Sequence, residues 1–245
     1  MRKCYYLPIL SLLLGVAGAF FRERQMATGF DSDGLAVYGN IWAILLAVLS
    51  AVAAVLFILF LFKLKTAGPV DGAEIGVRTP VYPVVCGVAS AFLLAAGMIG
   101  LIEYIRFETD ILRNLLLSAF AVITALCTAS VSLVIYKGKD MKNTGIISTL
   151  PVFFMCFWLI VAYREHAANP VIYDYVYQML AIICGTMGFF YSAGFVFGKN
   201  KPARAVFFML MSVFFSLVII AETQTIADIM FFVFLCVYMF TRAFS

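Results

Sequence analysis

Residues 41–62 read IWAILLAVLSAVAAVLFILFLF, a run of twenty-two residues without a charge. A bilayer has a hydrocarbon core about 30 Å thick, and a helix needs about 20 apolar residues to cross it. At about 1.5 Å per residue this run is about 33 Å long as a helix. Lipid offers the backbone no hydrogen-bond partners, and the strands of a membrane barrel would alternate in polarity, which this run does not. The run therefore predicts a membrane-spanning helix.

Seven further apolar segments flank this run. Hydrophobic residues make up 64% of the 245 residues and charged residues 12%, and the mean hydropathy is +1.05. A soluble domain has about 45–50% apolar and about 25% charged residues. We predict an all-α fold, a polytopic transmembrane helix bundle that forms a single integral membrane domain over residues 1–245. The eight expected spans are roughly 5–21, 38–62, 82–102, 111–136, 145–163, 171–198, 203–221 and 226–243.

The gaps between the apolar segments alternate in charge. With the N-terminus inside, the inner gaps hold 12 of the 17 Lys and Arg residues, all eight lysines among them, and three of the 13 Asp and Glu residues. Lys and Arg in short loops favour the cytoplasmic side. We predict an N-in, C-in protein with four outward-pointing hairpins. The compact plan with short loops favours the cell membrane, specifically a bacterial inner membrane, and the basic residues indicate orientation rather than nucleic-acid binding.

Two local features leave alternatives open. Arg2-Lys3, an apolar run and Ala17-Gly18-Ala19 resemble a secretory signal peptide with its cleavage site, whose removal would leave seven spans. We favour retention, because Arg22-Glu23-Arg24 follows at once. Pro151 lies inside the fifth segment, so that helix either begins near residue 149 and is short, or continues and bends at the proline.

No motif in the chain carries recognisable chemistry. The six cysteines are scattered without a pairing pattern, and His166 is the only histidine, so we expect no disulfide framework, no metal site and no cofactor. The sequence lacks the nucleophile elbow, the zinc-protease motif and the phosphate-binding loop, so we expect no catalytic residues of those classes. No ionisable residue lies at the middle of a span, which disfavours a proton relay at that depth.

The fourth segment carries a stripe of small and hydroxyl side chains at helical spacing. Small residues on one face let a neighbouring helix approach closely. We expect packing within one chain, with a homo-oligomer or a partner membrane subunit as the alternative. The residues are Ser118, Ala121, Ala125, Thr128 and Ser132.

Charged residues gather where the spans reach the outer side. If the hairpins pack together, these residues form either a solvated rim of ion pairs, which contribute little, or an outward-facing vestibule for a polar or charged ligand. Carboxylates in such a site would bind a cation or an amine, and arginines an anion. The candidate ligand-binding residues are Glu103, Arg106, Arg164, Glu165, His166, Asp174 and Glu222.

Three functions fit this pattern. The first is a membrane protein that binds or passes a small solute through the outer site, which is a transporter-like or channel-like role. The second is a non-transporting membrane subunit or scaffold that docks a partner protein through faces such as that of Ala121 and Ala125. The third is a membrane enzyme that acts on a lipid head group at the outer face, with His166 and Glu165 as an acid–base pair.

Overall fold

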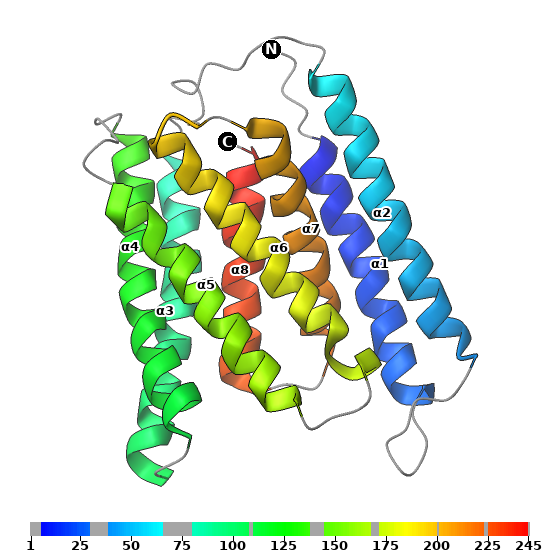
Figure 1. The fold of residues 1–245 in the computed structure, drawn as a ribbon, viewed down its shortest axis with the longest axis horizontal. Coiled ribbons are helices and arrows are strands. Elements are labelled where there is room, and N and C mark those ends of the chain that lie inside the picture. The colour runs from blue at the N-terminus through cyan, green and yellow to red at the C-terminus, as the bar shows by residue number, and fades with distance from the viewer. Residues whose placement is uncertain are drawn as a thin grey trace.

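Eight long helices make up the computed structural model, which describes residues 6–29, 39–65, 80–107, 110–137, 145–167, 172–199, 201–222 and 225–244 (Figure 1). These parts of the chain contain no strand, and each helix is long and apolar enough to cross a membrane. The predicted all-α bundle of an integral membrane protein is confirmed. The helices are α1 (Tyr6–Thr28), α2 (Ile41–Lys65), α3 (Val81–Phe107), η2 (Ile111–Leu117, π-helical) continuing into α4 (Ser118–Tyr136), α5 (Gly145–His166), α6 (Ile172–Val196), α7 (Pro202–Ile220) and α8 (Ile226–Phe244).

Local sequence sets several helix ends. The Asn40 side-chain oxygen accepts hydrogen bonds from the backbone N–H groups of Trp42 (2.9 Å) and Ala43 (3.2 Å), and so caps α2. Pro202 begins α7, where its missing N–H costs no helical hydrogen bond. Gly198 follows α6 with φ +71°, and the Lys199 N–H then bonds the Gly194 carbonyl, which closes the helix.

The helices pack around α7 and α8. Consecutive helices pair as α1–α2, α3–α4, α5–α6 and α7–α8, as the hairpin plan predicts. In addition, α7 packs against α1 and α6, and α8 packs against α3. Helix α1 begins and α8 ends at the same end of the bundle, at the top of Figure 1. We call this the inner end and the opposite one the outer end, after the orientation that the charges predict.

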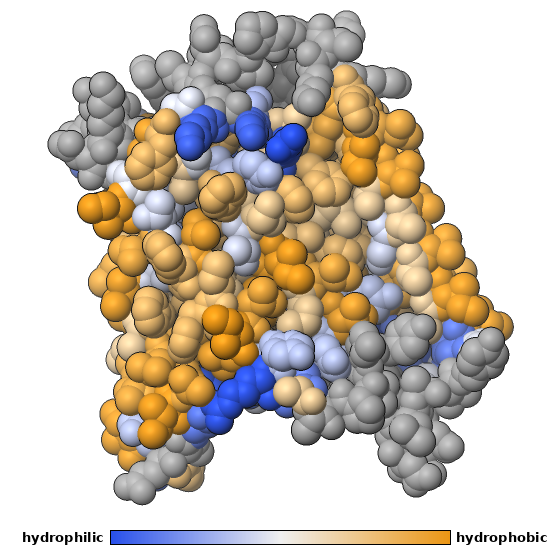
Figure 2. All heavy atoms as spheres, viewed as in Figure 1, coloured by the Kyte–Doolittle hydropathy of each residue, from blue (hydrophilic) through white to orange (hydrophobic). Residues whose placement is uncertain are grey.

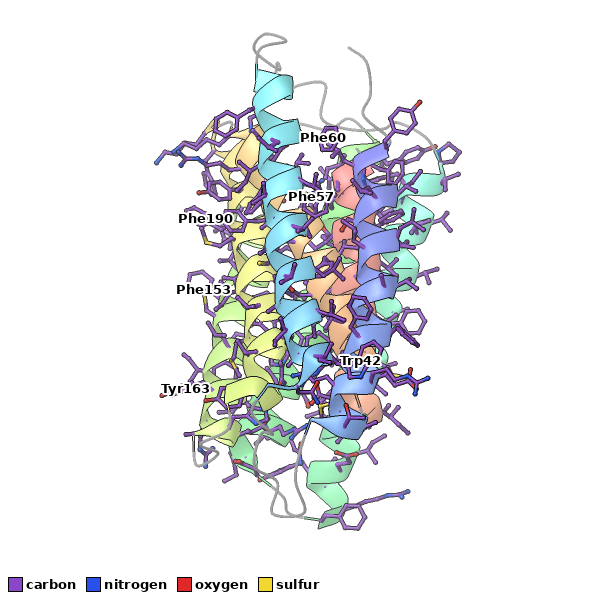
Figure 3. All side chains as sticks on the ribbon, turned by 90° about the vertical axis from the view of Figure 1, so that its right-hand side faces the viewer. Trp42, Phe57, Phe60, Phe153, Tyr163 and Phe190 are labelled. Atoms are coloured by element: carbon purple, nitrogen blue, oxygen red, sulfur yellow. The ribbon has the colours of Figure 1, made fainter. Side chains whose placement is uncertain are left out.

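Apolar side chains cover the outside of the bundle. Figure 2 shows them across the middle of one face, with hydrophilic residues gathered toward its two ends. Phe153 is 65% and Phe190 56% exposed, and both point away from the bundle together with Tyr163, whereas Phe57 is fully buried (Figure 3). Helix α2 is the least buried span and α7 the most. A surface of this kind matches lipid tails.

The small-residue stripe of α4 is buried inside the chain. Its five members are at most 3% exposed, and α4 packs closely against α3. A Cβ atom added at Gly97 would come within 2.9 Å of the Ser118 carbonyl oxygen, so glycine permits this approach. The expectation of packing within one chain is confirmed, and Ala121 and Ala125 are not available to a partner protein.

Three elements differ from the sequence-based plan. Helix α1 continues to Thr28, so that Arg22 and Gln25 lie within the helix rather than beyond it. The fourth span begins with a π-helical stretch, which periodicity did not predict. Helix α5 runs through Pro151 from Gly145 to His166, so the short-helix alternative is wrong.

Candidate functional site

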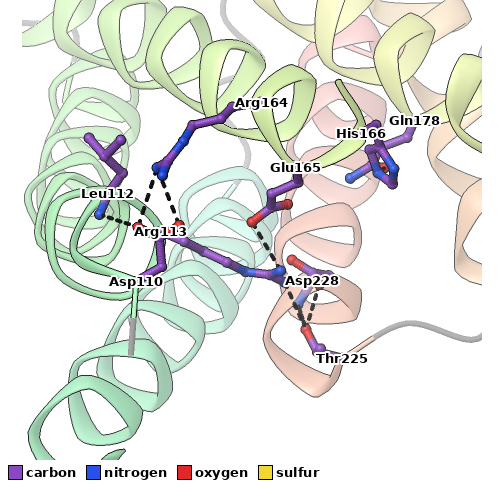
Figure 4. A network of polar contacts seen from close by, with 9 residues as sticks. All are labelled: Asp110, Leu112, Arg113, Arg164, Glu165, His166, Gln178, Thr225 and Asp228. Carbon is purple, nitrogen blue, oxygen red and sulfur yellow. Dashed lines mark hydrogen bonds and ion pairs between the residues drawn. The ribbon is translucent and has the colours of Figure 1, made fainter. Parts of the chain in front are cut away.

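The π-helical start of the fourth span positions an arginine at the outer end. The Asp110 side chain accepts a hydrogen bond from the Leu112 N–H at 3.1 Å and caps η2. A π-helix is wider than an α-helix and is rare, and it is found often at functional sites. Arg113 lies in the first turn of this stretch, and its side chain extends toward α5 and α8 (Figure 4).

Arg113 joins three helices through two carboxylates. Its guanidinium lies 3.0 Å from a Glu165 oxygen at the end of α5 and 2.5 Å from an Asp228 oxygen at the start of α8. The Thr225 hydroxyl also donates a hydrogen bond to Asp228 (Figure 4). Arg113 is 32% exposed and Asp228 16%, so the cluster lies at the edge of the bundle rather than deep inside it. We call Arg113, Glu165 and Asp228 the arginine cluster.

A cavity of about 180 Å³ lies beside the arginine cluster, between α3, the start of the fourth span and α8. We call it the outer cavity. Its wall combines two carboxylates and one guanidinium with small and apolar side chains. The lining residues are Ala96, Gly100, Glu103, Arg113, Asn114, Leu117, Ser118, Thr225, Ala227, Asp228 and Phe231.

Arg164 lies next to the arginine cluster but outside it. Its guanidinium contacts both oxygens of Asp110 at 3.2 and 3.3 Å (Figure 4). The two side chains are 55% and 46% exposed. An exposed pair of this kind contributes about 0–1 kcal/mol. The pair joins the end of α5 to the start of η2, and Arg164 does not line the cavity.

His166 belongs to a different cluster on the same face. Its Nε2 lies 2.9 Å from the side-chain oxygen of Gln178, and its ring stacks on Tyr175 with a centroid distance of 4.9 Å. The neighbouring Glu165 bonds Arg113 instead. His166 and Glu165 therefore make their polar contacts with different residues. This arrangement does not support the hypothesis that the two act as one acid–base pair.

A buried ion pair joins α1 to the end of α7. Arg22 is fully buried, and its guanidinium lies 2.8 Å from a Glu222 oxygen and 3.3 Å from the Gln25 side-chain oxygen. It also lies over the Tyr177 ring, 5.4 Å from the centroid. A charge at low dielectric is costly unless paired and hydrogen-bonded, and these contacts supply both. Glu222 thus takes part in fastening helices together and does not line the outer cavity.

The seven candidate residues are therefore distributed over several places. Glu103 lines the outer cavity and Glu165 belongs to the arginine cluster beside it. Arg106 is exposed. Arg164, His166 and Glu222 make the separate contacts described above, and the side chain of Asp174 lies outside the part of the chain that the structure describes.

Sequence reasoning left Arg113 and Asp228 out of the candidate site, although both were visible as charges at the outer edge. The sequence feature that could have indicated Arg113 and Asp228 is the shortness of two connections. Short turns after α3 and after α7 keep both residues close to the bundle.

Within the described ranges, no three His, Cys, Asp or Glu side chains are grouped in a way that could hold a metal ion.

Comparison with known proteins yields no relative. No family model matches the chain, and neither a curated protein nor a solved structure matches it.

Proposed function

We propose that this integral membrane protein binds a small cationic solute in the outer cavity. The observation that carries the proposal is the charge around this cavity. Among the described residues, the carboxylates of Glu103 and Asp228 and the guanidinium of Arg113 line the cavity, and the carboxylate of Glu165 bonds Arg113 beside it. Clefts with low-dielectric walls focus such an excess of one sign and concentrate ions of the other.

Of the three carboxylates, that of Glu103 is the one that a ligand in the outer cavity would contact most directly. Asp228 and Glu165 each bond Arg113, whereas Glu103 is an exposed lining residue on α3. A positively charged group at Glu103 would also lie in the field of Asp228. Phe231 adds an aromatic ring to the lining, and aromatic faces attract ammonium groups.

The size of the cavity restricts the solute. A cavity of about 150 Å³ accommodates benzene, which has six heavy atoms. The outer cavity, at about 180 Å³, therefore suits an organic ammonium ion of similar size. Drug-sized ligands occupy pockets of about 300–1,000 Å³, and the outer cavity is too small for them.

Binding of tetramethylammonium to the purified protein in lipid nanodiscs tests this proposal. Tetramethylammonium is a permanent cation of suitable size, and tert-butanol is a neutral molecule of similar shape. We expect saturable heat release with tetramethylammonium, none with tert-butanol, and binding weakened roughly tenfold by Glu103→Gln, which corresponds to about 1.4 kcal/mol.

Glu23→Gln is the matched control, because Glu23 is an exposed acid on α1 near the same end that does not line the cavity. It should bind as the unmodified protein does. Absence of binding, or equal binding by the Glu103→Gln and unmodified proteins, would overturn the proposal.

A further inference from the structure

A second cavity lies among α4, α5, α6 and α8 and shares no lining residue with the outer cavity. We call it the small cavity. Its volume is about 20 Å³, which is enough for one water molecule or one ion of similar size. Ser148 in the first turn of α5 and Arg242 in the last turn of α8 both line it. The small cavity therefore lies toward the inner end of the bundle.

The wall of the small cavity carries one guanidinium and, among the described residues, no carboxylate. The guanidinium is that of Arg242, which donates a hydrogen bond to the Tyr82 hydroxyl at 2.9 Å and is thereby held in position. A guanidinium has several N–H groups, so it can donate to Tyr82 and to a ligand at the same time. The remaining wall consists of hydroxyl, aromatic and aliphatic side chains. At the low dielectric of a helix bundle, a wall with this charge favours an anion.

The Ser148 hydroxyl gives the small cavity a second hydrogen-bond donor. Its oxygen is buried and has no hydrogen-bond partner in the part of the chain that the structure describes. Other hydroxyls in the spans, such as that of Ser192 in the same wall, donate to the carbonyl four residues earlier in their own helix. Ser148 has no such carbonyl within α5, because this helix begins only three residues before it. An unpaired buried hydroxyl costs free energy, and a ligand that accepts its hydrogen bond removes this cost.

We propose that the small cavity binds one monoatomic anion, such as chloride, between the Arg242 guanidinium and the Ser148 hydroxyl. The volume excludes sulfate, phosphate and carboxylates, because each has several heavy atoms and the cavity has room for about one. The bound anion accepts hydrogen bonds from both side chains, and so joins the start of α5 to the end of α8. This site is separate from the outer cavity and does not depend on the function proposed for it.

Thermal unfolding of the purified protein in detergent tests the anion site, because a ligand that binds only the folded protein raises its melting temperature. Sodium gluconate is replaced stepwise by sodium chloride at constant ionic strength, so that the screening of charges stays the same. Gluconate is too large for the small cavity. We expect the melting temperature to rise with the chloride concentration and to reach a plateau, and bromide to act as chloride does.

Two serine variants connect this effect to the small cavity. Ser148→Ala should raise the chloride concentration of half-maximal effect roughly tenfold, because hydrogen bonds to charged groups are among the stronger ones. Ser212→Ala is the matched control, because the Ser212 hydroxyl is also buried without a partner among the described residues, but lies on α7 and lines neither cavity. It should respond to chloride as the unmodified protein does. No chloride effect, or an equal effect in both variants, would overturn the inference and indicate that the small cavity holds only water.

Anomalous diffraction locates the anion directly and keeps the test decisive if Ser148→Ala folds poorly. Crystals of the unmodified protein grown in sodium bromide should show an anomalous peak within hydrogen-bond distance of the Ser148 Oγ atom and the Arg242 guanidinium. Absence of a peak at this position would contradict the site. Neither measurement involves tetramethylammonium, so the anion site and the proposed function can each fail without the other.

Discussion

The arginines at the outer end differ in depth, and depth decides what each ion pair contributes. Arg22 is fully buried, Arg113 is 32% exposed and Arg164 is 55% exposed. Exposed pairs contribute about 0–1 kcal/mol, while removal of one partner of a buried pair costs about 3–5 kcal/mol because the other charge is left without compensation. The largest effect of a single charge on stability is therefore expected at Arg22 and Glu222.

Loss of the Glu222 carboxylate tests this comparison. We expect Glu222→Ala to lower the free energy of unfolding by about 3–5 kcal/mol, whereas Arg164→Ala should lower it by about 0–1 kcal/mol. Unfolding of the purified protein in detergent, followed by circular dichroism, measures both. The double variant Arg22→Met, Glu222→Leu should be more stable than Glu222→Ala, because it leaves no buried charge unpaired.

Equal losses for Glu222→Ala and Arg164→Ala would show that depth does not decide the contribution. Glu222→Gln should also leave tetramethylammonium binding unchanged, because Glu222 does not line the outer cavity. That result would separate Glu222 from the ligand-binding role that the sequence suggested for it.

Sequence reasoning predicted where these charges lie but not how they pair. Arg22 and Glu222 are 200 positions apart, and their contact depends on the packing of α1 against α7. Hydropathy identifies each span, and the charges beside it indicate the side on which it ends. Neither shows how the helix is rotated or which helices it contacts. Glu222 and Glu165 could therefore be placed at one end of the bundle without any sign that they bond different arginines.

At the scale of single elements, the outer cavity depends on the close approach of α3 to the start of α4. Gly97 and Gly100 lie on the face of α3 that meets Ser118. A closer or wider spacing here would move η2, and with it Arg113. The hydropathy pattern predicted eight helices long and apolar enough to cross a membrane, because burial in lipid needs only length and apolarity. It did not predict η2, because that stretch is apolar in either helical form.

Substitution of Gly97 by alanine tests the role of this close approach. The added Cβ would lie 2.9 Å from the Ser118 carbonyl oxygen, which belongs to the backbone and can yield only if α4 moves. Overpacking of this kind costs about 1–3 kcal/mol. We expect Gly97→Ala to lower the melting temperature and to weaken tetramethylammonium binding, because the wall of the outer cavity shifts.

Gly87→Ala on the same helix provides the control, because nothing lies within 4 Å of a Cβ atom at Gly87. It should retain both the melting temperature and the binding of the unmodified protein. If Gly97→Ala behaves like Gly87→Ala, the spacing of α3 and α4 does not govern the outer cavity.

At the scale of the whole molecule, two features of different origin agree. The eight helices return the chain to the end of the bundle where it began, which requires both termini on one side. Independently, the sequence assigns 12 of the 17 basic residues to the connections and span ends on the side predicted to be inner. A single charge difference would be weak evidence for orientation, but the same sign recurs in each gap on that side. Under the proposed function, the orientation in turn decides which compartment would supply the cation, because the outer cavity lies toward the other end.

Reporter fusions test this orientation in bacterial cells. Alkaline phosphatase is active only outside the cytoplasm, so a fusion after residue 109, between α3 and α4, should be active, and one after residue 140, between α4 and α5, should be inactive. A green fluorescent protein fused after Ser245 should fluoresce, because it folds in the cytoplasm. The opposite pattern would mean that the carboxylates of the outer cavity face the cytoplasm. Under the proposed function the cation would then come from inside the cell, and the orientation predicted from the charges would be wrong.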